Sequence, residues 1–220
     1  WGFGRAGQDA PPTAAPTAEA IAAAKARTGT DKLEIDVAGA TVRKRAQVQV
    51  DLSSIAPGLA ADRIAAALIE LGHPDAMVEV GGEVRTVGVN QAGAPWKIAI
   101  ERPSAPGEPR RVYTIVALDG GLATSGDYRQ FRELDGVRVS HTIDPRTGRP
   151  VTHGLTSVTV IAEDAARADA LATALMVMGE AEALEFARAH ALPVLLLTLA
   201  ADGTLREQQT EAFAELRTAG

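Results

Sequence analysis

The chain has 220 residues and a net charge of −6, with 46% hydrophobic, 23% charged and 4% aromatic residues. This length allows one large domain or two small ones, and the composition is ordinary for a soluble globular protein. The acidic balance argues against a broad nucleic-acid interface, which requires a basic face. No apolar run approaches the ~20 residues that span a bilayer, so no transmembrane segment is predicted. The absence of Cys excludes disulfides and thiolate metal sites.

Two kinds of apolar periodicity divide the chain into helices and strands. Apolar residues three and four apart, often ended by Gly, predict helices over residues 17–28, 58–71, 165–178 and 180–189. Alternating or short continuous apolar runs predict strands over residues 32–37, 41–50, 76–80, 84–87, 96–100, 111–118, 131–134, 137–143, 157–162 and 193–199, with another from 204 and a helical tail from 207. Because the strands come mostly as hairpins, we predict an α+β fold: a two-layer sandwich of mostly antiparallel sheets with helices covering one face. A strands–helix–strands order occurs twice, which allows an internal duplication.

The turn over residues 51–58 precedes the second predicted helix. A small-residue turn at a helix N-terminus exposes backbone N–H groups, which suit an anion such as phosphate. The alternative is an ordinary strand-to-helix connection in which Ser53 and Ser54 cap the helix.

The stretch from Thr124 to Pro150 has a predicted hairpin at its centre, with the turn pair Asp135-Gly136 between the strands. We expect turns on both flanks, at residues 124–127 and at residues 144–148. The hairpin would carry His141 near one end, beside a hydroxyl-rich loop. Rigid strands that present polar groups into turns form many functional sites, whereas the alternative is a surface hairpin with solvated ends.

Asp169 and Thr173 are four residues apart on the predicted helix 165–178, so they share one face. Carboxylate and hydroxyl oxygens are hard ligands of the kind that Mg²⁺ accepts. The alternative is a half-exposed Asp beside a Thr that bonds back to its own helix.

Five motifs, in order and with sensible gaps, make the chain resemble the ApbE family, the FAD:protein FMN transferases once described as thiamine-biosynthesis lipoproteins. They are VDLSSIAPGLAADR, VEVGGEVRTVG, ATSGDYRQF, HTIDPRTGRPV and SVTVIAEDAARADALATALMVMG. The resemblance covers essentially residues 1–220, which we interpret as one family domain. The first residues, WGFG (Trp1–Gly4), also resemble a turn of that family. Family members carry a further segment before this turn, and we expect it to precede Trp1.

The resemblance implies a Mg²⁺-dependent transfer of FMN from FAD to a Thr or Ser hydroxyl of an acceptor redox protein, with release of AMP. Some relatives instead hydrolyse FAD to FMN and AMP, so an FAD pyrophosphatase is an alternative. A catalytically inactive flavin-binding protein is another. Family members are usually exported, often as lipoproteins, which implies an extracytoplasmic location, periplasmic or at the outer face of the cell membrane.

The resemblance also assigns roles to residues of this chain. Asp169, Thr173 and Ser54 would bind the metal, and His141 would be the catalytic base or position a phosphate. The residues implied to contact or shape the FAD site are Asp51, Pro57, Ser125 and Ile143. Three residues depart from the family pattern: Ser53-Ser54 stands where Gly-Gly or Gly-Ala is common, and Pro57 stands where Lys is frequent and another polar residue less so. Pro57 lacks a side-chain donor and a backbone N–H, and it favours the inactive alternative.

Overall fold

The computed structural model describes residues 1–4, 9, 12–104, 109–126, 131–200 and 204–217. The chain divides into two compact units, one formed by Trp1–Asp51 with Gln130–Thr152 and the other by Leu52–Arg129 with His153–Gly220. It thus leaves the first unit after residue 51 and returns to it for residues 130–152. Within the described ranges, no helix is both long and apolar enough to cross a membrane.

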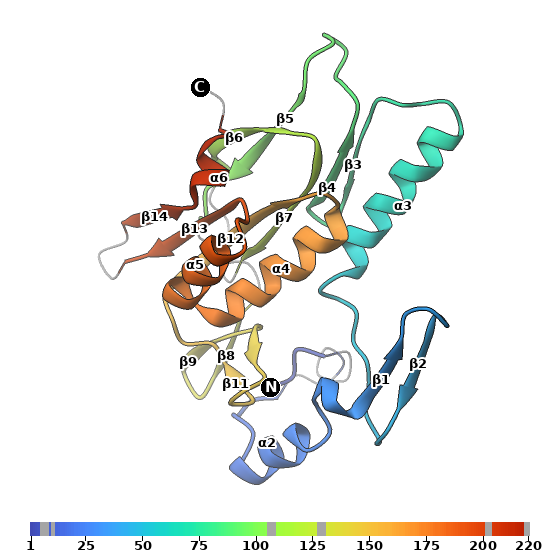
Figure 1. Cartoon of the computed structure of the whole chain (residues 1–220). Coiled ribbons are helices and arrows are strands. Elements are labelled where there is room, and N and C mark those ends of the chain that lie inside the picture. Colours follow the sequence, from blue (N-terminus) through green and yellow to red (C-terminus); the bar gives the residue numbers. More distant parts are fainter. Residues whose placement is uncertain (5–8, 10–11, 105–108, 127–130, 201–203, 218–220) are drawn as a thin grey trace. The chain divides into compact units, whose positions relative to one another are not determined.

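Over its described residues, the first unit contains a short helix of eight residues, a 3₁₀ turn and three small hairpins. Thr17 caps the helix, because its hydroxyl accepts a hydrogen bond from the Ala20 N–H at 3.2 Å. The elements are α2 (Ala18–Lys25), η1 (Thr30–Lys32), β1 (Leu33–Asp36), β2 (Thr41–Lys44), β8 (Phe131–Leu134), β9 (Val137–Ser140), β10 (Ile143–Asp144) and β11 (Arg149–Pro150), coloured along the chain in Figure 1. The predicted helix and the two predicted hairpins are therefore confirmed.

The hairpin β8–β9 turns at Asp135 and Gly136, whose φ angles of 52° and 73° are those of the predicted tight turn. The second strand was predicted to run to residue 143, but it ends at Ser140. Ile143 instead pairs with Pro150 in the hairpin β10–β11. The predicted turn between β10 and β11 is confirmed, with the Gly148 N–H donating to the Asp144 carbonyl at 2.7 Å.

The hairpin β1–β2 is shorter than predicted and has little cover. The second strand ends at Lys44 rather than at residue 50. Ile35 and Val42 are paired in the register and remain 62% and 59% exposed. An isolated two-stranded ribbon of this kind is marginally stable in water.

The second unit is built on a six-stranded sheet in the order β14-β13-β12-β7-β4-β3, in which every neighbouring pair is antiparallel. A separate hairpin pairs β5 with β6. The elements are α3 (Ala56–Glu70), β3 (Ala76–Val80), β4 (Glu83–Val87), β5 (Trp96–Glu101), β6 (Val112–Leu118), β7 (Gly120–Gly126), β12 (Leu155–Ala162), α4 (Ala165–Met178), α5 (Glu180–Ala189), β13 (Val194–Leu199), β14 (Leu205–Gln209) and α6 (Glu211–Ala214). The tail predicted to be helical from residue 207 is thus strand to Gln209 and helix only after it.

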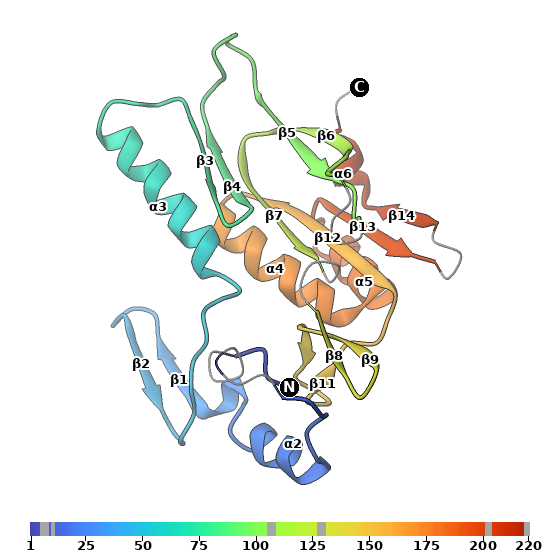
Figure 2. The same ribbon diagram turned by 180° about the vertical axis from the view of Figure 1, so that it is seen from behind.

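Both faces of this sheet are buried along its central strands. Along β13, Val194 and Leu196 join the apolar cluster under α4 and α5, whereas Leu195 and Leu197 join a second cluster with the β5–β6 hairpin and Phe213 of α6. Figure 1 shows α3, α4 and α5 along the sheet, and Figure 2 shows β5, β6 and α6 side by side. The expectation of a cover on one face was therefore wrong. A strand with apolar side chains on both faces, such as β13, requires other elements to pack against both faces of the sheet.

The turn predicted over residues 124–127 was wrong for its first three residues, which belong to strand β7. Thr124 to Gly126 continue the strand and pair with β12, and Asp127 lies outside the described residues. A Cβ atom on Gly121 would lie 2.1 Å from the carbonyl carbon of Asp164. The missing side chain therefore lets the start of α4 pack directly on the strand.

We expect Gly121→Ala to destabilise the protein by about 1–3 kcal/mol or more, because the added methyl group would overlap backbone atoms that cannot move independently. Urea unfolding measures the effect. Gly4→Ala is the matched control, since a Cβ atom there meets nothing within 4 Å. Equal stabilities of the two variants would contradict the close packing of α4 on β7.

Candidate functional site

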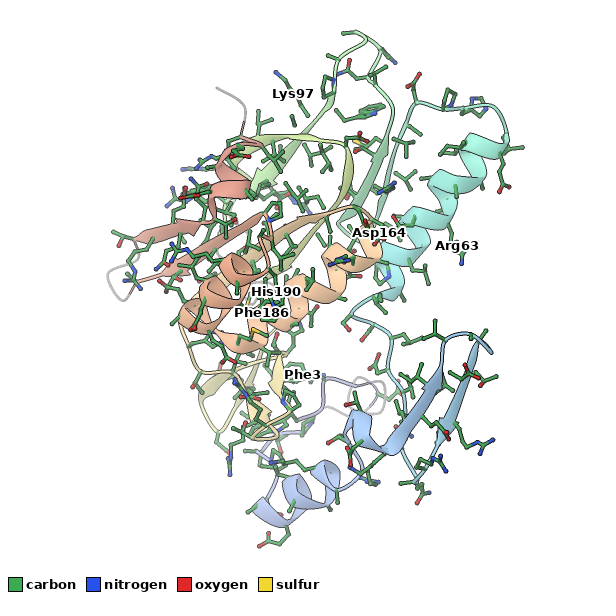
Figure 3. The ribbon with its side chains drawn as sticks, viewed as in Figure 1. Phe3, Arg63, Lys97, Asp164, Phe186 and His190 are labelled. Atoms are coloured by element: carbon green, nitrogen blue, oxygen red, sulfur yellow. The ribbon has the colours of Figure 1, made fainter. Side chains whose placement is uncertain are left out.

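The start of α4 is held by two carboxylates. Asp164, labelled in Figure 3, accepts a hydrogen bond from the Arg167 N–H at 2.7 Å and confirms the predicted cap. Asp62 of α3 accepts from the N–H groups of Ala165 and Ala166, each at 2.9 Å. The free N–H groups of the first turn of α4 are thus satisfied by protein groups, which fixes the helix that carries Asp169.

Asp169 is buried, with 6% of its surface exposed, and the Gly58 N–H donates to its Oδ2 at 3.1 Å. This contact requires glycine, because a Cβ atom on Gly58 would lie 2.3 Å from the Ala165 carbonyl oxygen. Burial raises the pKa of Asp169 above its ordinary 3.8, and the hydrogen bond from Gly58 opposes part of that rise. The first turn of α3 therefore delivers a backbone donor to a buried carboxylate.

Thr173 lies one turn after Asp169 on α4, as predicted, and its hydroxyl is 3.3 Å from the Ser125 hydroxyl at the end of β7. Ser125 was predicted in a loop, but a strand delivers it. A buried carboxylate and two neighbouring hydroxyls are hard oxygen donors, so these residues fit Mg²⁺. Over the described ranges, no group of three or more His, Asp or Glu side chains is arranged to hold a metal ion. Such a cation would therefore need hydroxyl, backbone or substrate oxygens as well.

Pro57 and Ser54 belong to the same end of α3. Pro57 is in the first helical turn, where proline is well tolerated. Ser54 is exposed in the turn before the helix. The alternative in which the serines cap the helix was wrong, because the N-cap residue is Ile55 and no side chain caps the helix there.

The remaining predicted site residues belong to the first unit. Ile143 is half-buried in β10, and Asp51 is exposed. His141 follows β9, and its ring meets the edge of Phe3 at a centroid distance of 6.3 Å. The predicted site residues are thus divided into two sets, one in each unit. That the two sets form one site stays a prediction.

The aromatic turn at the start of the chain contacts the predicted HTIDPRTG motif. The Trp1 Nε1–H donates to the Gly148 carbonyl at 2.8 Å, and Phe3 packs against both His141 and the Arg132 guanidinium. All three contacts lie within the first unit. Phe3, a residue to which the sequence assigned no role, is therefore a packing partner of His141.

Glu83 is a second carboxylate beside Asp169 that the sequence did not single out. It is half-buried at the start of β4. Burial raises its pKa above 4.5, and the negative charge of Asp169 raises it further. The one available sequence signal was its place in VEVGGEVRTVG, directly after two glycines.

A cavity of about 340 Å³ lies between α3, β4 and the start of α4. Arg63, Asp62, Arg85 and Asp164 line it together with Leu59 and Ile69; Figure 3 labels Arg63 on α3 and Asp164. Its lining does not include Asp169 or Thr173. Since Asp62 already occupies the N–H groups of α4 there, the cavity offers no helix terminus to an anion.

A family model described as the ApbE family matches residues 1–196. The chain belongs to the ApbE family. Two relatives, each an FAD:protein FMN transferase, are 45% identical over 215 residues (Vibrio cholerae) and 43% identical over 220 residues (Haemophilus influenzae). These matches cover 97% and 98% of this chain and 62% of each relative, so the chain spans less than two thirds of their length.

The structure of the Pseudomonas stutzeri flavinyl transferase ApbE, in its apo form, matches this chain with a TM-score of 0.83 and 42% identity. The match covers 100% of this chain and 66% of that one. The predicted α+β fold of mainly antiparallel sheets with helices is thus confirmed as an ApbE fold.

We expect Asp169→Asn to raise the free energy of unfolding in metal-free buffer at pH 7. The pKa of Asp169 is higher in the folded protein than in the unfolded chain, so the folded state favours the protonated side chain. This stabilisation is complete below pH 3.8 and is lost as the pH rises through the folded pKa. Asn removes the charge and keeps an oxygen for the Gly58 N–H. Urea unfolding with EDTA measures the gain, at about 1.4 kcal/mol per pKa unit of difference.

Glu185→Gln, an exposed change on α5, is the control and should leave the free energy of unfolding unchanged. A lower stability of Asp169→Asn at pH 7 would contradict the inference that the ionised Asp169 carboxylate destabilises the folded protein.

Proposed function

We propose that this chain carries the FMN-transferring part of an FAD:protein FMN transferase. Two relatives with that name, at 45% and 43% identity over nearly the whole chain, support the activity. The buried Asp169, which accepts a hydrogen bond from the Gly58 N–H and lies one turn before Thr173 on α4, is the structural observation that carries it. The substrates proposed are FAD and an acceptor redox protein with a Thr or Ser hydroxyl.

The proposed reaction breaks the phosphoanhydride bond of FAD and forms a phosphoester bond to the acceptor. The acceptor hydroxyl oxygen attacks the phosphorus of the FMN half of FAD, and the bond from that phosphorus to the bridging oxygen breaks. AMP leaves with the bridging oxygen. His141 accepts the proton of the attacking hydroxyl, a task for which imidazole is suited near neutral pH.

Mg²⁺ is the proposed cofactor, and Asp169, Thr173 and Ser54 are the residues that would hold it. A bound Mg²⁺ offsets the negative charge of the pyrophosphate in the transition state. Asp51, Pro57, Ser125 and Ile143 are proposed to contact or shape the flavin nucleotide site. Gly58 holds Asp169 with its N–H, so the carboxylate keeps one orientation before any ligand arrives.

An FAD pyrophosphatase is the second candidate, in which water replaces the acceptor hydroxyl. It would use the same residues, so the products distinguish the two reactions. Pro57 favours a third candidate, an inactive flavin-binding protein, because proline supplies neither a cationic side chain nor a backbone donor. We also propose an extracytoplasmic location, periplasmic or lipid-anchored at the outer face of the membrane, from the family resemblance.

The test is incubation of the purified chain with FAD and Mg²⁺, with and without an acceptor peptide, followed by analysis of AMP, FMN and flavinylated peptide. Peptide-dependent AMP release with covalent FMN supports the transferase, and free FMN without peptide dependence supports the pyrophosphatase. Binding of FAD without AMP in either condition supports the inactive protein.

We expect Asp169→Ala to reduce Mg²⁺-dependent AMP release by about 100-fold or more, because the variant lacks the buried carboxylate that would bind the cation. Circular dichroism should show that the fold is retained. Glu185→Ala is the matched control, an exposed acidic residue on the neighbouring helix α5, and should keep full activity. Unchanged AMP release from Asp169→Ala would overturn the metal assignment.

A further inference from the structure

Glu83 begins β4 directly after Gly81 and Gly82, whose φ angles are 71° and 112°. These left-handed conformations turn the chain sharply between β3 and β4. A Cβ atom placed on Gly81 would lie 3.0 Å from Glu83 Oε2 and 3.6 Å from Pro57 Cβ. The carboxylate of Glu83 therefore folds over Gly81, beside the first turn of α3.

The same turn of α3 holds Asp169. Pro57 borders Gly81, and the next residue, Gly58, donates its N–H to Asp169 Oδ2 at 3.1 Å. Glu83 and Asp169 thus flank the Pro57–Gly58 turn, one from β4 and the other from α4. Their proximity has an electrostatic cost, since the charge of Asp169 raises the pKa of Glu83.

The nearest basic side chain on β4 does not neutralise this pair. Arg85 lies two residues after Glu83 and so leaves β4 on the same face. Its guanidinium donates to the Glu163 carbonyl and lies 3.8 Å from Asp62 Oδ1. Arg85 therefore does not offset the negative charges of the half-buried Glu83 and the buried Asp169.

We propose that Glu83 is a further metal-binding residue, which shares a divalent cation with Asp169 at the Pro57–Gly58 turn. A divalent cation would balance both negative charges, so the pair that is unfavourable without metal becomes favourable with it. Two carboxylates, from two different elements, also fix the cation more firmly than one. This role for Glu83 rests on the proposed function, because it presupposes a cation at Asp169.

The test measures the binding of Mn²⁺, as a substitute for Mg²⁺, to the full chain by electron paramagnetic resonance of the free ion. We expect Glu83→Gln to weaken Mn²⁺ binding by about 10-fold or more. Glu79→Gln is the matched control for a general effect of charge. Glu79 is exposed on the neighbouring strand β3, and its charge also raises the pKa of Glu83. Because solvent screens an exposed charge, this variant should bind Mn²⁺ within about twofold of the wild type.

A second measurement shows that Glu83→Gln has not simply unfolded. In metal-free buffer its unfolding temperature should equal or exceed that of the wild type, because the substitution removes the repulsion from Asp169. Added Mn²⁺ should raise the unfolding temperature of the wild type and of Glu79→Gln more than that of Glu83→Gln.

The outcomes separate the two proposals. If the wild type binds Mn²⁺, Asp169→Ala does not and Glu83→Gln binds like the wild type, the role of Glu83 is overturned and the proposed metal site stands. Equal weakening by Glu83→Gln and Glu79→Gln would also overturn it, since that would be a general effect of charge. If the wild type binds no Mn²⁺, the metal site of the proposed function fails, and the role of Glu83 fails with it.

Discussion

The close approach of α3 to α4 at Gly58 is the constraint on which the candidate site depends. A side chain at this position would overlap the Ala165 carbonyl, so the crossing exists only because the residue is glycine. The crossing places the Gly58 N–H against Asp169, and it lets Asp62 reach the first N–H groups of α4. One missing side chain therefore determines both how the two helices pack and how the buried carboxylate is oriented.

Gly121 plays the corresponding part on the other side of α4. It lets β7 lie directly under the start of the helix, and the strand then brings Ser125 to Thr173. The candidate metal ligands thus depend on backbone packing at two glycines rather than on the ligands' own contacts. A substitution at either glycine would displace α4 as a body, together with Asp169 and Thr173.

Much of the fold could be read from the sequence, because strong local signals and tertiary packing agree there. Asp164 and Gly179 bound α4 as predicted, and Asp135-Gly136 forms the predicted turn. Strand β7 could not be read, since three of its seven residues are glycines, which have low strand propensity, and packing under α4 makes this segment a strand. Glu83 could not be read either, because its coupling to Asp169 joins residues far apart in the sequence. The placement of Asp169 and Thr173 on one face of α4 could be predicted from their spacing, whereas their role as metal ligands is implied by the resemblance and stays a prediction.

The hairpin β1–β2 behaves differently from the six-stranded sheet in one further respect. Its strands are four residues long, are paired only with each other and keep Ile35 and Val42 largely exposed. Few buried contacts oppose its opening, so its amide protons should exchange with solvent through local fraying rather than through unfolding of the whole chain. The same fraying would make this ribbon the segment of the first unit that a protease reaches first.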